Sequence, residues 1–130
     1  MILLWIFIWF LCLWIVYFAF FQTKKKLSKQ EQWEIQKLFR TIIHIKNSKE
    51  KIIESDKLYH KMLMLSGYTG TFWEILKQNP NIIQNINKIW ELHKLRNTLS
   101  HEFDEIEEKI LSKKSKEYTK EIENLLQNIS

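Results

Sequence analysis

The stretch SKQEQWEIQKLFRTIIHIKNSKEKIIESDKLYHKMLMLSG, residues 28–67, decides the fold class. It has no proline, its single glycine is terminal, and it lacks alternating β-branched runs, so we expect helices. The segment S-K-Q-E at residues 28–31 has the spacing of a capping box, which predicts a first helix that ends near Asn47. Ser48 is suited to cap a second helix that ends at Gly67. Only two Gly and one Pro occur in the whole chain, which predicts an all-α protein.

Apolar residues at helical spacing predict which side of each helix faces the core. For the first helix these residues are Trp33, Leu38, Ile42 and Ile45. For the second helix they are Ile52, Tyr59, Met62 and Leu63.

The next two helices are predicted from their start signals. T-F-W-E at residues 71–74 is another capping box, and its helix should end at Gln78 because Asn79 precedes a proline. Asn79 suits the cap and Pro80 the first position of the next helix, so we expect a long helix over residues 80–101.

The C-terminal part is predicted to be helical with one open question. Asp104 and Glu107 are placed to cap a further turn or two, and Ser112 is placed to start a last helix. The polar stretch 113–116 interrupts the apolar stripe, so one helix and two helices are both compatible with the pattern. Residues 28–130 therefore predict a small antiparallel bundle of about four to five helices.

Outward to the N-terminus, residues 1–22 form an uninterrupted apolar run without a charged residue or a histidine. The run is long enough for a hydrocarbon core of about 30 Å. It lacks the basic start and the small-residue cleavage site of a signal peptide. These features predict a retained membrane-spanning anchor over residues 2–21, in contact with the lipid bilayer.

A basic linker, residues 23–27, follows the predicted span. Its lysines, Lys24, Lys25 and Lys26, are predicted to flank the membrane on the inner side. The positive-inside tendency then predicts a single-pass protein of the cell membrane, with the N-terminus outside and the C-terminal domain cytoplasmic.

Composition restricts the chemistry. Lys and Arg number 20 against 15 Asp and Glu, which gives a net charge of +5. This excess is compatible with anionic lipid or nucleic acid as a partner, and equally with a plain bias toward Lys, Ile and Asn.

Cys12 is the only cysteine and lies in the apolar run, which excludes a disulfide framework, a cysteine zinc site and a thiol nucleophile in residues 28–130. We predict no cofactor and no metal.

The helix predicted over residues 80–101 changes character halfway along. On the face that carries isoleucines in the first half, the second half carries polar residues: His93, Arg96, Asn97 and Ser100. Half-buried polar groups need partners, so this half-face must be satisfied by the fold, by a second subunit or by a ligand.

The segment L-R-N-T-L-S-H, residues 95–101, resembles the signature of HEPN domains, which is Arg, four to six residues and then His, usually with a polar residue after the Arg. The longer stretch 90–102 is similar to that of small membrane-anchored bacterial proteins. For active HEPN members the resemblance implies metal-independent RNA cleavage. It makes Arg96 a clamp for phosphate, Asn97 an orienting residue and His101 the acid–base residue.

Geometry limits this implied site. Arg96 and His101 lie about 140 degrees apart on an ideal helix, so their side chains converge only if the helix end unwinds or if two subunits meet. Because the family builds composite sites between two subunits, the resemblance also implies a homodimer.

Three functions are compatible with the sequence. The first is a membrane-anchored, non-catalytic HEPN-like module for dimerisation and for binding a nucleotide, RNA or a protein, in which His93 and Ser100 join the binding face. The second is a metal-independent endoribonuclease acting at the cytoplasmic face of the membrane. The third is a binder of membrane surfaces that holds anionic lipid through Lys24 to Lys26.

Overall fold

The computed structural model describes the backbone of residues 1–21, 25–101 and 105–130, and all side chains of these residues except those of 19–21. Over these ranges the chain forms six helices and no strand. In chain order they are α1 (Ile2–Phe21), α2 (Lys29–Ile43), α3 (Ser48–Leu65), α4 (Phe72–Lys77), α5 (Ile86–His101) and α6 (Glu108–Ile129).

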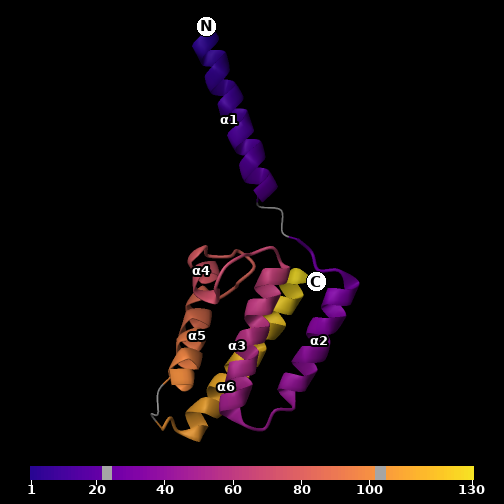
Figure 1. Ribbon diagram of the computed structural model, residues 1–130, viewed down its shortest axis with the longest axis vertical. Helices are drawn as coiled ribbons and strands as arrows, with labels where there is room; N and C mark the ends of the chain where they lie inside the picture. The colour runs from indigo at the N-terminus through magenta and orange to yellow at the C-terminus, as the bar shows by residue number, and fades with distance from the viewer. Residues whose placement is uncertain (22–24, 102–104) are drawn as a thin grey trace.

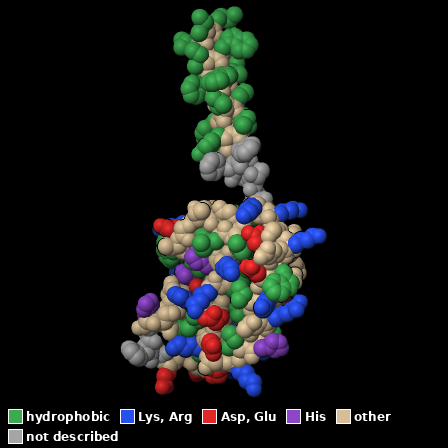
Figure 2. Space-filling model, turned by 45° about the vertical axis from the view of Figure 1, so that its right-hand side comes forward, with side chains coloured by type: hydrophobic (Ala, Val, Ile, Leu, Met, Phe, Trp, Pro, Cys, Tyr) green, Lys and Arg blue, Asp and Glu red, His purple; other side chains and the backbone are tan. Residues whose placement is uncertain are grey.

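Helix α1 lies apart from the other five helices and exposes apolar side chains (Figures 1 and 2). In the part of the chain that the structure describes, no helix combines the length and the apolar character that a bilayer crossing requires. The predicted membrane-spanning anchor over residues 2–21 is therefore wrong, and so are its predicted bilayer contact and the single-pass membrane localisation.

Of the three lysines predicted to flank a membrane, the structure describes two. Lys24 lies outside the described residues. The ammonium group of Lys25 lies 3.8 Å from the carboxylate of Glu31, and Lys26 is exposed.

The remaining helices form a bundle, as the sequence predicts. Helices α3 and α6 pack against each other in its centre, with α2 on one side and α5 on the other (Figure 1). The fully buried side chains that form the core come mainly from these four helices: Ile35, Ile52, Tyr59, Met62, Leu63, Ile89, Leu92, Tyr118, Ile122 and Leu125.

Helix α2 begins at the predicted capping box but turns a different face to the core. Its buried residues are Ile35, Phe39 and Ile42, at the i, i+4 and i+7 spacing of one helical face. Trp33 lies about 200 degrees from Ile35 around the helix and is 61% exposed, and Leu38 is also exposed. The prediction that Trp33 and Leu38 face the core is wrong, because their stripe diverges from the one that the bundle buries.

Helix α3 starts one residue earlier than predicted and ends as predicted. Asn47, not Ser48, accepts a hydrogen bond on its side chain from the amide of Glu50. Gly67 follows the helix with φ +101°, and the amide of Tyr68 donates to the carbonyl of Leu63, which closes a Schellman motif.

Helix α5 begins at Ile86, six residues after the predicted start at Pro80. Asn79 adopts φ 49°, and the chain turns over residues 80–85 before Asn85 caps the helix by accepting from the amide of Lys88 at 3.1 Å. Buried Ile82 fixes this turn, because its carbonyl accepts a hydrogen bond from Asn128. The predicted cap, Asn79, does not start a helix, since its φ of 49° lies in the left-handed region and an N-cap residue has an extended backbone.

Helix α6 settles the open question at the C-terminus, because a single helix runs through Ser112 and the polar stretch 113–116. Glu107 precedes it without a capping side-chain bond. Asp104, the other predicted cap, lies outside the described residues.

Candidate functional site

A polar network lies inside the bundle where α3, α5 and α6 meet. Asp56 of α3, His93 of α5 and Tyr118 of α6 are all buried. A buried carboxylate is costly unless it is paired and hydrogen-bonded. The contacts of Asp56 therefore define the site.

Four of its residues form a closed ring. His93 Nδ1 lies 2.9 Å from Asp56 Oδ1, and His93 Nε2 lies 3.4 Å from Asn97 Nδ2. Arg96 Nη1 donates to Asn97 Oδ1 at 3.0 Å. Arg96 Nε lies 3.6 Å from Asp56 Oδ2, which closes the ring with an ion pair.

The ring determines how His93 is used. With Nδ1 facing a carboxylate, that nitrogen carries the proton, and Nε2 accepts from the amide of Asn97. This assignment of the proton follows from the hydrogen-bond network. Both ring nitrogens of His93 are thus engaged inside the protein, and neither is free to act on a substrate.

Tyr118 gives Asp56 a further partner. Its hydroxyl donates to Asp56 Oδ1 at 2.6 Å. Burial, and next the negative charge of Asp56, raise the pKa of the Tyr118 phenol well above its ordinary value. The phenol therefore stays protonated and keeps donating.

Aromatic rings close the network on the side of α4. The ring of Phe72 meets His93 edge to face at a centroid distance of 4.4 Å, and Tyr59 stacks on Phe72 at 5.9 Å. His60 lies on Phe72 at 5.4 Å, and its Nε2 lies 3.1 Å from the carbonyl of Gly70.

Arg96 connects the buried ring to the surface. Its side chain is 28% exposed, although Nε is buried and makes no hydrogen bond. Among the described residues, the one hydrogen bond of the guanidinium is that from Nη1 to Asn97. Arg96 Nη2 makes no hydrogen bond among the described residues, and Asp56 and Asn97 orient the partly exposed guanidinium.

The structure does not bring the predicted Ser100 and His101 into this ring. The hydroxyl of Ser100 donates to the backbone carbonyl of Arg96 at 3.0 Å, a bond within the helix. His101 is exposed in the last turn of α5, which stays helical to its end. Arg96 and His101 thus keep the separation of about 140 degrees that an ideal helix gives them, and they form no joint site within one subunit.

Two members of the site, Asp56 and Tyr118, escaped prediction from the sequence. Asp56 occupies the core stripe of its helix, four residues after Ile52 and three before Tyr59. The sequence offered one signal for Asp56, which is an acidic residue among the apolar residues of a predicted core face. Such a residue predicts a buried partner, but it does not identify that partner as His93.

Comparisons add no relative to this picture. No protein-family model matches the chain, and neither a curated protein nor a solved structure is significantly similar to it. In the described part of the chain, no group of three or more His, Cys, Asp and Glu side chains is placed to hold a metal ion. The chemistry that the site offers is that of a guanidinium toward an anion.

Proposed function

We propose that the bundle is a non-catalytic, HEPN-like binding module that forms a homodimer and holds a phosphate group of RNA or of a nucleotide on Arg96. The observation that carries the proposal is the partly exposed guanidinium of Arg96, whose Nε faces Asp56 and whose Nη1 donates to Asn97. A fork held in one orientation loses little freedom when it binds an oxyanion.

The charge balance of the ring favours this use of Arg96. Asp56 offsets part of the charge of the guanidinium through Oδ2, while its Oδ1 is shared by His93 and Tyr118. Phosphate groups accept the two parallel hydrogen bonds that an arginine fork presents. The ring therefore orients Arg96 but does not neutralise its charge completely, so the guanidinium still attracts an external anion.

The same geometry argues against catalysis within one subunit. His93 uses both ring nitrogens inside the protein, and His101 lies on another side of α5. General acid–base catalysis needs a group within hydrogen-bond reach of the reacting proton. A bound phosphate on Arg96 would have no such group beside it.

The second candidate is a metal-independent endoribonuclease with a site completed by a second copy of the chain. The observation that favours it is His101, which is exposed and makes no hydrogen bond among the described residues. Across a homodimer, His101 of one copy and Arg96 of the other could meet.

Incubation of labelled RNA with the full chain in the presence of a chelator tests both candidates. The proposal expects binding without cleavage, weaker binding in Arg96→Ala, and little change in His101→Ala. If the wild-type chain cleaves the RNA and both substitutions abolish this cleavage, the result would support the nuclease instead. Binding that is unchanged in a folded Arg96→Ala variant would refute the proposal, and sedimentation analysis of the same samples tests the homodimer.

A further inference from the structure

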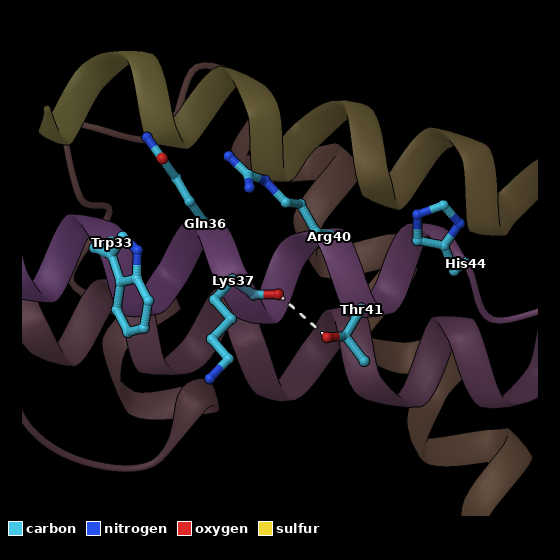
Figure 3. Close-up of a pocket in the computed structure, with 6 residues that line it drawn as sticks. All are labelled: Trp33, Gln36, Lys37, Arg40, Thr41 and His44. Carbon is cyan, nitrogen blue, oxygen red and sulfur yellow. Dashed lines mark hydrogen bonds between the residues drawn. The ribbon is translucent and has the colours of Figure 1, made fainter.

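The outer side of α2 carries a groove of about 370 Å³ (Figure 3). We call it the α2 groove. The side chains that line it share one stripe of the helix: Trp33, Gln36, Lys37, Arg40, Thr41 and His44. The stripe extends about 16 Å along the helix axis. It is separate from the face with Ile35 and Phe39 that α2 buries.

Trp33 is the apolar element of the α2 groove. Its side chain is 61% exposed, although a tryptophan gains more than most residues by burial. Lys37, one turn later, places its ammonium group 5.2 Å from the centre of the Trp33 ring. The groove thus joins an accessible aromatic surface to a cation (Figure 3).

Arg40 and Gln36 form the other edge of the α2 groove. Both extend from α2 on the side of α6 (Figure 3). Arg40 is exposed and makes no ion pair or hydrogen bond among the described residues. It is also one of only two arginines in the chain.

Among the residues that the structure describes, no carboxylate lines the α2 groove. Of the acids on α2, Glu31 is held at the start of the helix, where it accepts from the backbone amide of Ser28 at 2.7 Å. Glu34 is exposed on the same helix but outside the lining. The local charge of the lining therefore comes from Lys37 and Arg40.

We infer that the α2 groove binds single-stranded nucleic acid, with a base stacked on Trp33 and phosphates held by Arg40 and Lys37. Stacking on aromatic rings and basic side chains that follow the backbone are the two elements of such binding. The amide of Gln36 adds a donor and an acceptor for a base edge. The volume of the groove is at the lower end of the range for small-molecule sites, which suits one base with its phosphate.

This inference is independent of the function proposed for Arg96. Helices α2 and α5 lie on either side of the pair α3 and α6 (Figure 1). The two sites can therefore be tested one at a time.

The test measures fluorescence anisotropy of a labelled oligouridine RNA and a labelled oligothymidine DNA with the full chain, in a non-ionic detergent that covers the exposed apolar side chains of α1. We expect Trp33→Leu to weaken binding of both strands about tenfold. Arg40→Ala should reduce the slope of log affinity against log salt by about 0.7. Preference for one strand identifies RNA or DNA as the ligand.

A matched control comes from a second Trp–Lys pair. Lys77 lies 5.3 Å from the ring centre of Trp73 on α4, outside the α2 groove. Lys77→Ala removes the same charge from the same arrangement as Lys37→Ala, so only Lys37→Ala should weaken binding. Circular dichroism checks that each variant is folded.

Three results would overturn the inference. They are no binding of either strand by the wild-type chain, equal affinity of wild type and folded Trp33→Leu, and loss of binding in Arg96→Ala alone. The last result would leave the proposal for Arg96 standing. Loss in Trp33→Leu with no effect of Arg96→Ala would support the α2 groove and count against Arg96.

Discussion

The carboxylate of Asp56 on α3 lies 2.9 Å from Nδ1 of His93 on α5, and both side chains are buried. The two residues are 37 positions apart in the sequence, so their contact joins two helices. Because Tyr118 of α6 donates to the same oxygen, one carboxylate links three helices. The stability of the bundle and the orientation of Arg96 therefore depend on the same group.

Substitution of Asp56 should cost far more than loss of an ordinary surface carboxylate. Asp56→Ala leaves His93 and Tyr118 without their acceptor and Arg96 without its ion-pair partner. We expect a loss of about 3 to 5 kcal/mol in the free energy of unfolding. Denaturant unfolding followed by circular dichroism measures this loss. Glu54→Ala is the matched control, because Glu54 lies on α3 in a surface pair with Lys57 and should change stability by less than about 1 kcal/mol. Equal effects of the two substitutions would contradict the described network.

Tyr118 should make the protein sensitive to alkaline pH. Its pKa is raised in the folded state by burial, while an unfolded tyrosine ionises near pH 10. Above about pH 10 the unfolded chain then binds fewer protons than the folded chain, so the free energy of unfolding falls as pH rises. Tyr118→Phe should flatten this fall, and Tyr68→Phe, at a less buried tyrosine, should keep most of it. Measurement of the free energy of unfolding from pH 8 to 11 tests this prediction. Parallel curves for wild type and Tyr118→Phe would show that Tyr118 does not cause the loss of stability at alkaline pH.

An ion-pair cluster between α5 and α6 should contribute a smaller, acid-sensitive term. Lys114 and Lys88 contact Glu91, and the hydrogen bond from Lys114 is the main cause that lowers the pKa of Glu91. A lowered carboxyl pKa stabilises the fold above the ordinary value of 4.5, and this contribution is lost as pH falls below it. Because Glu91 is half exposed, we expect less than about 1 kcal/mol.

Thermal unfolding between pH 3 and 7 checks the effect of Glu91. Glu91→Gln should unfold at lower temperature than wild type at pH 7, and the two should converge near pH 3. Glu105→Gln serves as the control, since Glu105 is exposed without an ion pair among the described residues. A constant difference between Glu91→Gln and wild type at every pH would show that the ion pairs do not contribute.

Local signals predicted much of the fold. The capping boxes at residues 28–31 and 71–74 and the stop at Gly67 are confirmed, because each depends on residues only a few positions apart. The start of α5 was predicted wrongly, because both Pro80 and Asn85 are helix start signals. The buried turn between them makes Asn85 the start, and this turn depends on a contact with α6. The core face of α2 was predicted wrongly because the helix carries two apolar stripes. Which of them is buried depends on the neighbouring helices, and the sequence of α2 alone does not show this.

The site was predictable on one helix only. His93, Arg96 and Asn97 share a face of α5, and the structure brings them together as the helical spacing suggests. Asp56 and Tyr118 lie on other helices, far away in the sequence. Helical periodicity relates only residues of the same helix, so it could not predict these two partners. The apolar run at the N-terminus misled the prediction in the opposite way, since its composition pointed to a membrane span that the described residues do not provide.

The affinity of Arg96→Lys for labelled RNA tests the central claim most directly. Lysine keeps the positive charge but loses the planar fork, so Kd should rise about tenfold if Arg96 holds a phosphate through two hydrogen bonds. The titration uses the Trp33→Leu background, in which the contribution of the α2 groove is reduced. Lys94→Ala, which removes an exposed charge from the same helix, should change Kd much less. A folded Arg96→Lys variant that binds RNA as tightly as its parent would contradict the account.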